Sequence, residues 1–271
     1  MRLVVVLICL ISQSAFAQIA VEKVVQGVST TLSEDSPKLS PDGTQLVFLR
    51  SVSEEWPASI YRQAWVTNEG MSITLPLGLD SVYTISLAYD AGSLFFSRRT
   101  ISAEGDRISF YRASGVPGNW QLTNITERDG ISASYAHQVK DGSIYFFQYE
   151  GEEGTGLYRS QWNGQQFEPP IWLGDVLSPP GTTTFSPFVS ADEDWMFFTT
   201  YYEEDGEAGR TGFYFARKVA GKWLKQKIKG LPYGWSASIG PANDYFYFTD
   251  GEDIYRCHIK DLGIDFDFGQ R

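Results

Sequence analysis

The sequence contains little cysteine and little histidine, which limits the stabilising and catalytic chemistry open to it. Of the 271 residues, two are cysteines and two are histidines, His137 and His258. Cys9 lies in an N-terminal apolar run, so a chain that loses this run keeps only Cys257 and forms no internal disulfide. His258 follows Cys257 directly, and neighbouring residues of a strand face opposite ways, so the pair does not begin a metal site. We therefore expect a fold that its hydrophobic core stabilises, without a metal centre.

Long apolar segments are missing beyond the N-terminus. Arg2 precedes the apolar run 3–11, and Ala15-Phe16-Ala17 follows it, which is the pattern of a secretory signal peptide. The run is far shorter than the roughly 20 residues that a transmembrane helix needs. The sequence predicts a signal peptide at 1–17, cleavage after Ala17, and a periplasmic or secreted product without a membrane span.

Positive charge is scarce, and so are the short motifs of common enzymes. The chain has 22 Lys and Arg against 33 Asp and Glu, a net charge of −11. Such a charge disfavours nucleic acid and anionic membrane surfaces as partners. The sequence contains no G-x-S-x-G nucleophile turn, no P-loop and no dinucleotide-binding glycine motif. These absences favour a binding protein over an enzyme.

A turn followed by an apolar strand recurs along the chain. The clearest copy is Ser40–Arg50, SPDGTQLVFLR, and variants of it begin at Tyr89, Lys140, Ala191 and Ala242. The spacings are 48, 51, 51 and 50 when these residues are taken as equivalent: Phe48, Phe96, Phe147, Phe198 and Phe248. A repeat of about fifty residues is typical of solenoids and propellers.

Each repeat contains several short strands. A second strand with period-two alternation follows the first, as in LYRSQW from Leu157, and no segment shows a sustained helical stripe. The pattern predicts an all-β fold, a five-bladed β-propeller of four-stranded antiparallel blades, as a single domain over 18–271. The expected units are approximately 34–80, 81–130, 131–180, 181–231 and 232–262. Either 19–25 or 263–268 is expected to close the fifth blade, because an open sheet edge invites pairing with other chains.

The turn and strand of the first repeat resemble a known family. Ser40-Pro41-Asp42-Gly43 with Phe48, together with the late run Asp253–Tyr255, is similar to the WD40-like repeat of TolB-type β-propellers. The resemblance implies a periplasmic binding scaffold. Propellers of this type usually have six blades, which leaves six as the alternative to five.

The innermost strands contain few carboxylates. The expected inner segments read DSPKLS, YTISLAY, SYAHQV, FSPFVS and WSASIGPA, and only the first includes an acid, Asp35, with Glu34 beside it. A propeller glycosidase needs two carboxylates on opposite sides of its substrate. Asp35 and Glu34 are therefore weak catalytic candidates, and a carbohydrate-binding or carbohydrate-active propeller with its ligand at the channel mouth is the alternative function.

Acidic residues gather in the loop between the second and third strand of each blade. These loops are expected on one face, where they would attract a basic protein or peptide, or a hard cation such as Ca²⁺. The acids expected to form this partner face are Glu150, Glu152, Glu153, Glu203, Glu204, Asp205, Glu207 and Asp253, with further acids at Glu54, Glu55, Glu104, Asp106, Asp250 and Glu252.

Aromatic residues mark the beginnings of the innermost strands on the same face. Such side chains at a channel mouth stack on a sugar or hold a peptide. The predicted ligand-binding residues are Tyr83, Tyr135, Phe185, Tyr233 and Trp235. The leading hypothesis is an exported, non-enzymatic propeller that binds a protein or peptide through this acidic, aromatic-lined face.

Overall fold

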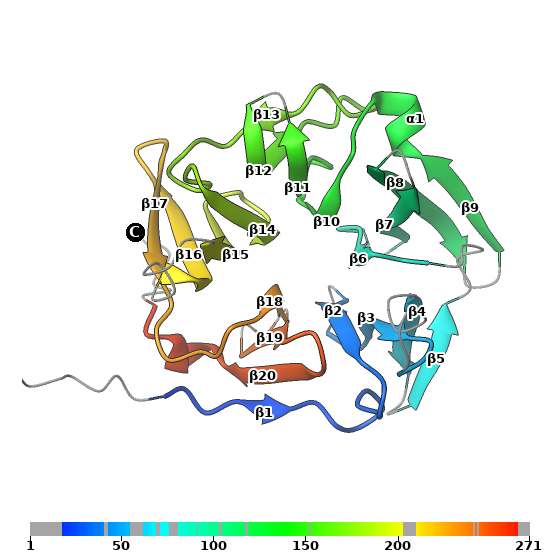
Figure 1. The fold of residues 1–271 in the computed structure, drawn as a ribbon, viewed down its shortest axis with the longest axis vertical. Coiled ribbons are helices and arrows are strands. Elements are labelled where there is room, and N and C mark those ends of the chain that lie inside the picture. The colour runs from blue at the N-terminus through cyan, green and yellow to red at the C-terminus, as the bar shows by residue number, and fades with distance from the viewer. Residues whose placement is uncertain are drawn as a thin grey trace, which may run out of the picture.

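The computed structural model describes residues 18–264, except 41–42, 55–61, 69–70, 76–80, 91, 103–104, 117–118, 152, 203–209, 241 and 243. Within these residues the strands form five four-stranded sheets, and every pairing between strands is antiparallel. The sheets surround a common centre as the blades of a propeller (Figure 1). The predicted five-bladed all-β fold is thus confirmed.

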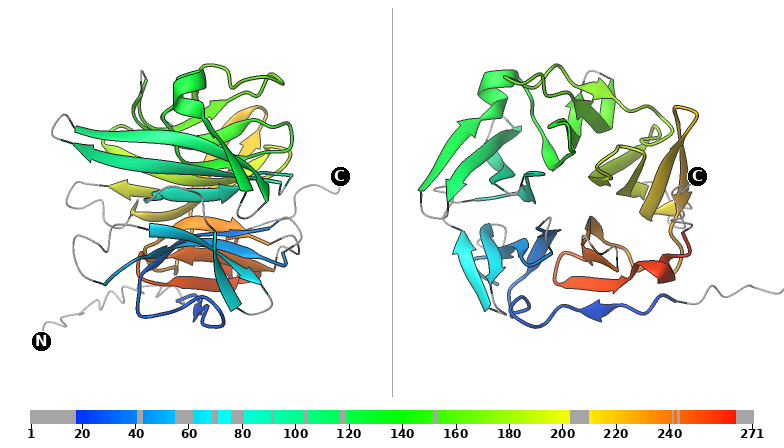
Figure 2. Two further views of the ribbon diagram at one scale, coloured as in Figure 1. Left: turned by 90° about the vertical axis from the view of Figure 1, so that its right-hand side faces the viewer. Right: turned by 180° about the vertical axis from the view of Figure 1, so that it is seen from behind.

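Each blade runs from an innermost to an outermost strand, and the innermost strands lie around the centre when seen from in front or behind (Figures 1 and 2). Blade one contains β2(Glu34–Leu39), β3(Leu46–Ser51), β4(Arg62–Asn68) and β5(Met71–Leu75). Blade two contains β6(Thr84–Leu87), β7(Ser93–Ser102), β8(Gly105–Val116) and β9(Asn119–Asn124). Blade three contains β10(Ser134–Gln138), β11(Ile144–Gly151), β12(Gly154–Ser160) and β13(Ile171–Trp172). Blade four contains β14(Thr182–Val189), β15(Trp195–Tyr202), β16(Gly212–Val219) and β17(Lys222–Lys227).

The fifth blade combines the two ends of the described chain. It contains β18(Trp235–Ile239), β19(Tyr245–Thr249) and β20(Ile254–His258), and β1(Glu22–Lys23) is its outermost strand. Glu22 pairs with Arg256, and the backbone N–H of Ile19 donates to the carbonyl of Gly230. Of the two segments expected to close this blade, 19–25 therefore supplies the edge strand, and residues 265–268 lie outside the described residues.

Helix is nearly absent from the described residues, but one short helix was not expected. Helix α1(Ile125–Asp129) begins at Asn124, whose side chain accepts a hydrogen bond from the backbone of Glu127, and ends at Gly130 with φ 75°. Five residues are too few to show a helical stripe in the sequence. A short 3₁₀ helix, η3(Ile259–Leu262), follows β20. In the part of the chain that the structure describes, no helix is long and apolar enough to cross a membrane.

The repeated phenylalanine fills the blade cores, with one correction to its register. The turn Val139–Ser143 is closed by a backbone hydrogen bond over four residues, whereas Ser40–Gln45 spans five. This shorter turn makes Phe146, and not Phe147, the third member of the series. The five equivalent residues are at most 1% exposed: Phe48, Phe96, Phe146, Phe198 and Phe248.

The innermost strands of four blades contain a β-bulge, and its first residue has a positive φ. In blade two the pairing of β6 with β7 runs on without a bulge. The bulge residues are Ser36, Tyr135, Ser186 and Ser236, with φ between 52° and 59°. Ser86 takes the equivalent position in blade two, and the residues that follow the bulge in the other four blades pair with the second strand: Lys38, His137, Phe188 and Ser238.

Candidate functional site

The acidic loops share a face with the beginnings of the innermost strands. Because the first two strands of each blade are antiparallel, the end of the second lies beside the start of the first, as in the pairs Glu34–Arg50 and Thr182–Tyr202. We call this side the N face and the opposite side the C face. Of the acids expected here, the structure describes the side chains of Glu54, Glu153, Asp250, Glu252 and Asp253.

The remaining acids of the expected partner face cannot be placed. Glu55, Glu104, Glu152, Glu203, Glu204, Asp205 and Glu207 lie outside the described residues, as do the side chains of Asp106 and Glu150. Among the described residues, no group of three or more His, Cys, Asp and Glu side chains is arranged to hold a metal ion. The acidic partner face stays a prediction, with Ca²⁺ as the alternative to a basic partner.

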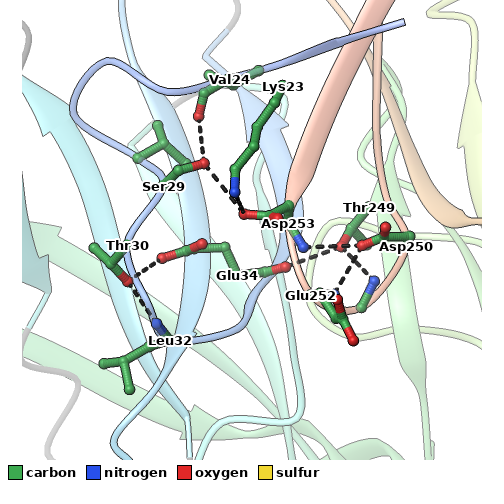
Figure 3. Close-up of polar contacts among 12 residues, drawn as sticks. Lys23, Val24, Ser29, Thr30, Leu32, Glu34, Thr249, Asp250, Glu252 and Asp253 are labelled. Carbon is green, nitrogen blue, oxygen red and sulfur yellow. Dashed lines mark hydrogen bonds and ion pairs between the residues drawn. The ribbon is translucent and has the colours of Figure 1, made fainter. Parts of the chain in front are cut away.

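Two acids of the fifth blade, Asp250 and Asp253, make ion pairs or hydrogen bonds with other residues of the chain (Figure 3). The carboxylate of Asp253 contacts Lys23 Nζ at 2.7 Å and accepts a hydrogen bond from Ser29 Oγ at 3.3 Å. The hydrogen bond from Lys23 to the Asp253 carboxylate raises the pKa of Lys23. Asp250 Oδ1 accepts the backbone N–H groups of Glu252 and Asp253, which shapes the turn. Asp253 therefore holds the N-terminal strand in place, while Glu252 is exposed on the N face.

Glu34 is buried between the first and fifth blades. Thr30 Oγ1 donates to Glu34 Oε1 at 2.7 Å, and Arg50 Nε contacts the same oxygen at 3.0 Å. The other oxygen, Oε2, is buried and has no hydrogen-bond partner in the described part of the chain. Burial of the side chain is the main cause that raises the pKa of Glu34. The contacts assign Glu34 a role in joining blades.

Asp35 is held in a second ion pair and does not face Glu34. Its side chain is almost fully buried, and its oxygens accept hydrogen bonds from Arg62 Nη1 and, at 3.0 Å, from Trp235 Nε1. Adjacent strand residues point to opposite sides, so the two carboxylates do not flank one substrate. The other four innermost strands, all described, contain no Asp or Glu.

The predicted ligand-binding aromatics lie together in two groups. The rings of Tyr83 and Tyr135 are 6.0 Å apart, and Tyr135 is 5.4 Å from Phe185. Burial raises the pKa of Tyr135 well above its usual value. In the second group Tyr233 is 5.9 Å from Trp235. The three residues of the first group are half-buried, whereas Tyr233 is 43% exposed.

A groove of about 400 Å³ opens on the N face between blades three and four. Tyr149, Glu153, Trp172 and Asp175 line it with the start of β14. Tyr149 is 66% exposed. Of these residues only Glu153 was predicted from the sequence, because Trp172 lies in a two-residue strand and Asp175 in a blade connection.

Exposed tyrosines continue from this groove toward the fifth blade. Thr183, which lines the groove, pairs with Tyr201 in the neighbouring strand. Tyr201 is 43% exposed, and its ring lies 6.3 Å from that of Tyr233. We call Tyr149, Tyr201 and Tyr233 the tyrosine track. It crosses blades three to five on the N face.

A second hollow, of about 430 Å³, lies at the C face where the innermost strands end. All five blades contribute to it, and most of its walls are apolar, including Leu39, Phe188 and Trp195. His137 also lines this hollow, its Nε2 lies 2.8 Å from the carbonyl of Val189, and burial lowers its pKa to about 3. A neutral imidazole therefore faces the C-face hollow.

Lys38 is a buried cation at the centre of the ring, and its replacement tests the cost of that charge. It is 6% exposed, its Nζ donates to the carbonyl of Ala237 at 2.9 Å, and burial lowers its pKa from 10.5 to about 8. We expect Lys38→Met to increase the free energy of unfolding at pH 7 by about 1–2 kcal/mol, since the desolvation it relieves exceeds the hydrogen bond it removes.

Urea denaturation measures this effect, with the exposed Lys222→Met as control. The unfolded chain binds the Lys38 proton up to a higher pH than the folded protein does, so the wild type should gain stability between pH 8 and 10.5. The Lys38→Met protein should lack this alkaline gain. Destabilisation at pH 7 would show that the ammonium contributes more than its burial costs.

The comparisons with known proteins support the fold. No protein-family model and no curated protein matches the sequence. TolB from Acinetobacter baumannii has a TM-score of 0.53 and 16% identity over 85% of this chain and 55% of that chain. A thermostable family-43 glycoside hydrolase has a TM-score of 0.52 and 13% identity over 85% of this chain and 90% of that one.

A further family-43 enzyme, GH43_12 from a capybara gut metagenome, has a TM-score of 0.52 at 10% identity, covering 85% of this chain and 52% of that chain. This chain thus spans about half the length of the TolB structure, with 55% covered. The similarity establishes a propeller shared with TolB and with glycoside hydrolases. Membership of the TolB-type family stays a prediction.

Proposed function

We propose that this chain is an exported, non-enzymatic propeller that binds a protein or peptide along the tyrosine track of its N face. The observation that carries the proposal is the exposure of Tyr149, Tyr201 and Tyr233, at 43–66%, on one face beside a groove. Tyrosine is enriched in protein interfaces because its ring gives contact area and its hydroxyl a hydrogen bond. The inner strands, with only two adjacent acids, support binding over hydrolysis.

The charges around the track indicate a basic partner. Glu153 and Asp175 line the groove, and Glu252 is exposed on the same face. The acids at Glu150, Glu152, Glu203, Glu204, Asp205 and Glu207 belong to the same proposed face. Complementary charge speeds association and sets orientation, while aromatic contacts supply most of the affinity. A lysine- or arginine-bearing segment laid across blades three to five fits both features.

Single alanine replacements along the track test the proposal. The full chain is immobilised, a partner is captured from an extract of the producing cells, and its affinity is then measured by titration with the purified partner. We expect Tyr149→Ala, Tyr201→Ala or Tyr233→Ala to weaken binding about 10- to 30-fold, the size of an interface hot spot. Tyr89→Ala is the matched control, because Tyr89 is 44% exposed but lines the C-face hollow. Loss of binding in the control alone would contradict the proposal.

A glycan is the second candidate ligand of the N-face groove. Tyr149 and Trp172 offer aromatic surfaces, and Asp175 and Ser178 offer hydrogen-bonding groups within the same groove. Titration with a panel of oligosaccharides, together with an assay for their hydrolysis, separates the two candidates. Hydrolysis by the wild type that Asp35→Asn abolishes, in a variant shown to be folded, would make the chain an enzyme and overturn the first proposal.

A further inference from the structure

A strongly basic segment forms the outer part of blade four, although the protein as a whole is acidic. Residues 208–243 contain no Asp or Glu, while the whole chain has a net charge of −11. Seven basic residues lie in this segment: Arg210, Arg217, Lys218, Lys222, Lys225, Lys227 and Lys229. This local reversal of charge lies in β16, β17 and the residues around them. We call β17 with its basic neighbours the basic edge.

Strand β17 is the outermost strand of its blade and lies at the outside of the ring (Figure 1). It pairs along its length with β16, from Val219–Lys222 to Tyr214–Lys227. In the described part of the chain no strand pairs with its other side. A strand edge of this kind presents backbone N–H and C=O groups to an added strand.

Apolar surface accompanies the basic side chains. Leu224 is 55% exposed and Val219 is 43% exposed. A hollow of about 250 Å³ lies beside the strand, and Phe215, Leu224 and Lys225 are among its walls. Lys225 lies 5.3 Å from the ring centre of Tyr214, and burial lowers its pKa to about 8. A cation that is partly removed from water interacts more strongly with an incoming anion.

The alternation along β17 defines the complementary chemistry. Trp223, Lys225 and Lys227 are half-buried on one side of the strand, and Lys222, Leu224 and Gln226 are exposed on the other. A strand added in register places alternate side chains beside these two rows. Carboxylates would meet Lys225 and Lys227, and an apolar side chain would cover Leu224.

We propose that the basic edge binds an extended acidic segment of a partner protein, in which acidic and apolar residues alternate, as an added strand. The open backbone edge favours a polypeptide over a lipid surface or a polyanionic glycan, because only a polypeptide matches its hydrogen-bonding groups at the strand spacing. The site lies on the rim of blade four, apart from the N-face groove, so the protein would join a basic partner to an acidic one.

The probe is a labelled eight-residue peptide of alternating Asp and Phe, titrated with the full chain by fluorescence anisotropy. We expect Lys225→Glu with Lys227→Glu to weaken binding at least tenfold, and Lys222→Glu, on the exposed row beside Leu224, to weaken it less than the double variant does. Lys140→Glu is the matched control, since it makes the same charge change at an exposed turn of blade three. Amide hydrogen exchange should slow in β17 when the peptide is bound.

Four results would overturn the proposal. Equal binding by a peptide of alternating Lys and Phe, or unchanged binding by the double variant, would show that the basic side chains do not attract the acidic peptide. An unchanged rate of amide hydrogen exchange in β17 would show that the peptide does not pair with β17 as an added strand. The sequence 264–268, Ile-Asp-Phe-Asp-Phe, has the same alternation. Tenfold tighter peptide binding by the full chain with Asp265→Lys and Asp267→Lys would show that its own end competes for the site, and would replace the partner as occupant.

Discussion

Replacement of Glu34 by alanine is expected to lower the free energy of unfolding by about 3–5 kcal/mol. The Glu34 side chain is fully buried, and that of Arg50 is only 7% exposed. Without the carboxylate, the buried guanidinium of Arg50 loses its ion pair with Glu34, and Thr30 loses its acceptor. Urea denaturation at pH 7, read by tryptophan fluorescence, gives the difference.

The control for this prediction is an exposed ion pair in the same part of the fold. Arg256 Nε contacts Glu22 Oε1, with the two side chains 35% and 55% exposed. Because water screens an exposed pair, Glu22→Ala should cost less than about 1 kcal/mol. A Glu34→Met, Arg50→Met double variant should be more stable than Glu34→Ala, since it removes both buried charges of the pair together. Equal losses for Glu34→Ala and Glu22→Ala would contradict this account.

Glu34 also lies at the junction between the first and fifth blades. Its backbone N–H donates to the carbonyl of Glu252 at 2.9 Å, and Thr249 Oγ1 donates to its carbonyl at 3.0 Å (Figure 3). These contacts join the first blade to the fifth, where the two ends of the chain meet. A closed ring of blades depends on this junction. The Glu34→Ala variant keeps these backbone contacts, so its expected loss comes from the side chain and its ion pair with Arg50.

The blade count was predictable because each blade repeats the same local chemistry. A turn, a strand with a buried phenylalanine and a second alternating strand recur often enough to define the period. The register of the third repeat was not predictable. Phe146 and Phe147 are adjacent and chemically identical, and the shorter turn Val139–Ser143 decides between them only through its backbone hydrogen bond. The closing strand was ambiguous for a similar reason, since both chain ends alternate.

The site was predictable only in part, because its properties arise from contacts between blades. Sequence reasoning treated Glu34 and Asp35 as alike, yet their neighbours Arg50 and Arg62 come from other strands and give each a separate ion pair. The N-face groove arises where the connection carrying Asp175 meets blade four, which no local pattern shows. By contrast, the grouping of Tyr233 with Trp235 followed from their shared place at the start of β18.

The second large effect is expected at acid pH and concerns His137. Burial lowers the pKa of His137 from 6.5 to about 3, and the charge of Lys38 adds to this effect. Between these two values the unfolded chain binds a proton that the folded protein does not. Stability should therefore fall as the pH falls from 6.5 toward 3, by about 1.4 kcal/mol for each pH unit.

A glutamine at position 137 separates this contribution from that of the carboxylates. Glutamine does not titrate, and its amide N–H can donate to the carbonyl of Val189 in place of the imidazole. At pH 4.5 the wild type should have lost about 2–3 kcal/mol more than His137→Gln, relative to each protein at pH 7.5. His258→Gln, at an exposed position, should follow the wild type. Parallel acid curves for the wild type and His137→Gln would mean that His137 takes up its proton in the folded protein, which requires water or an anion to reach it through the C-face hollow.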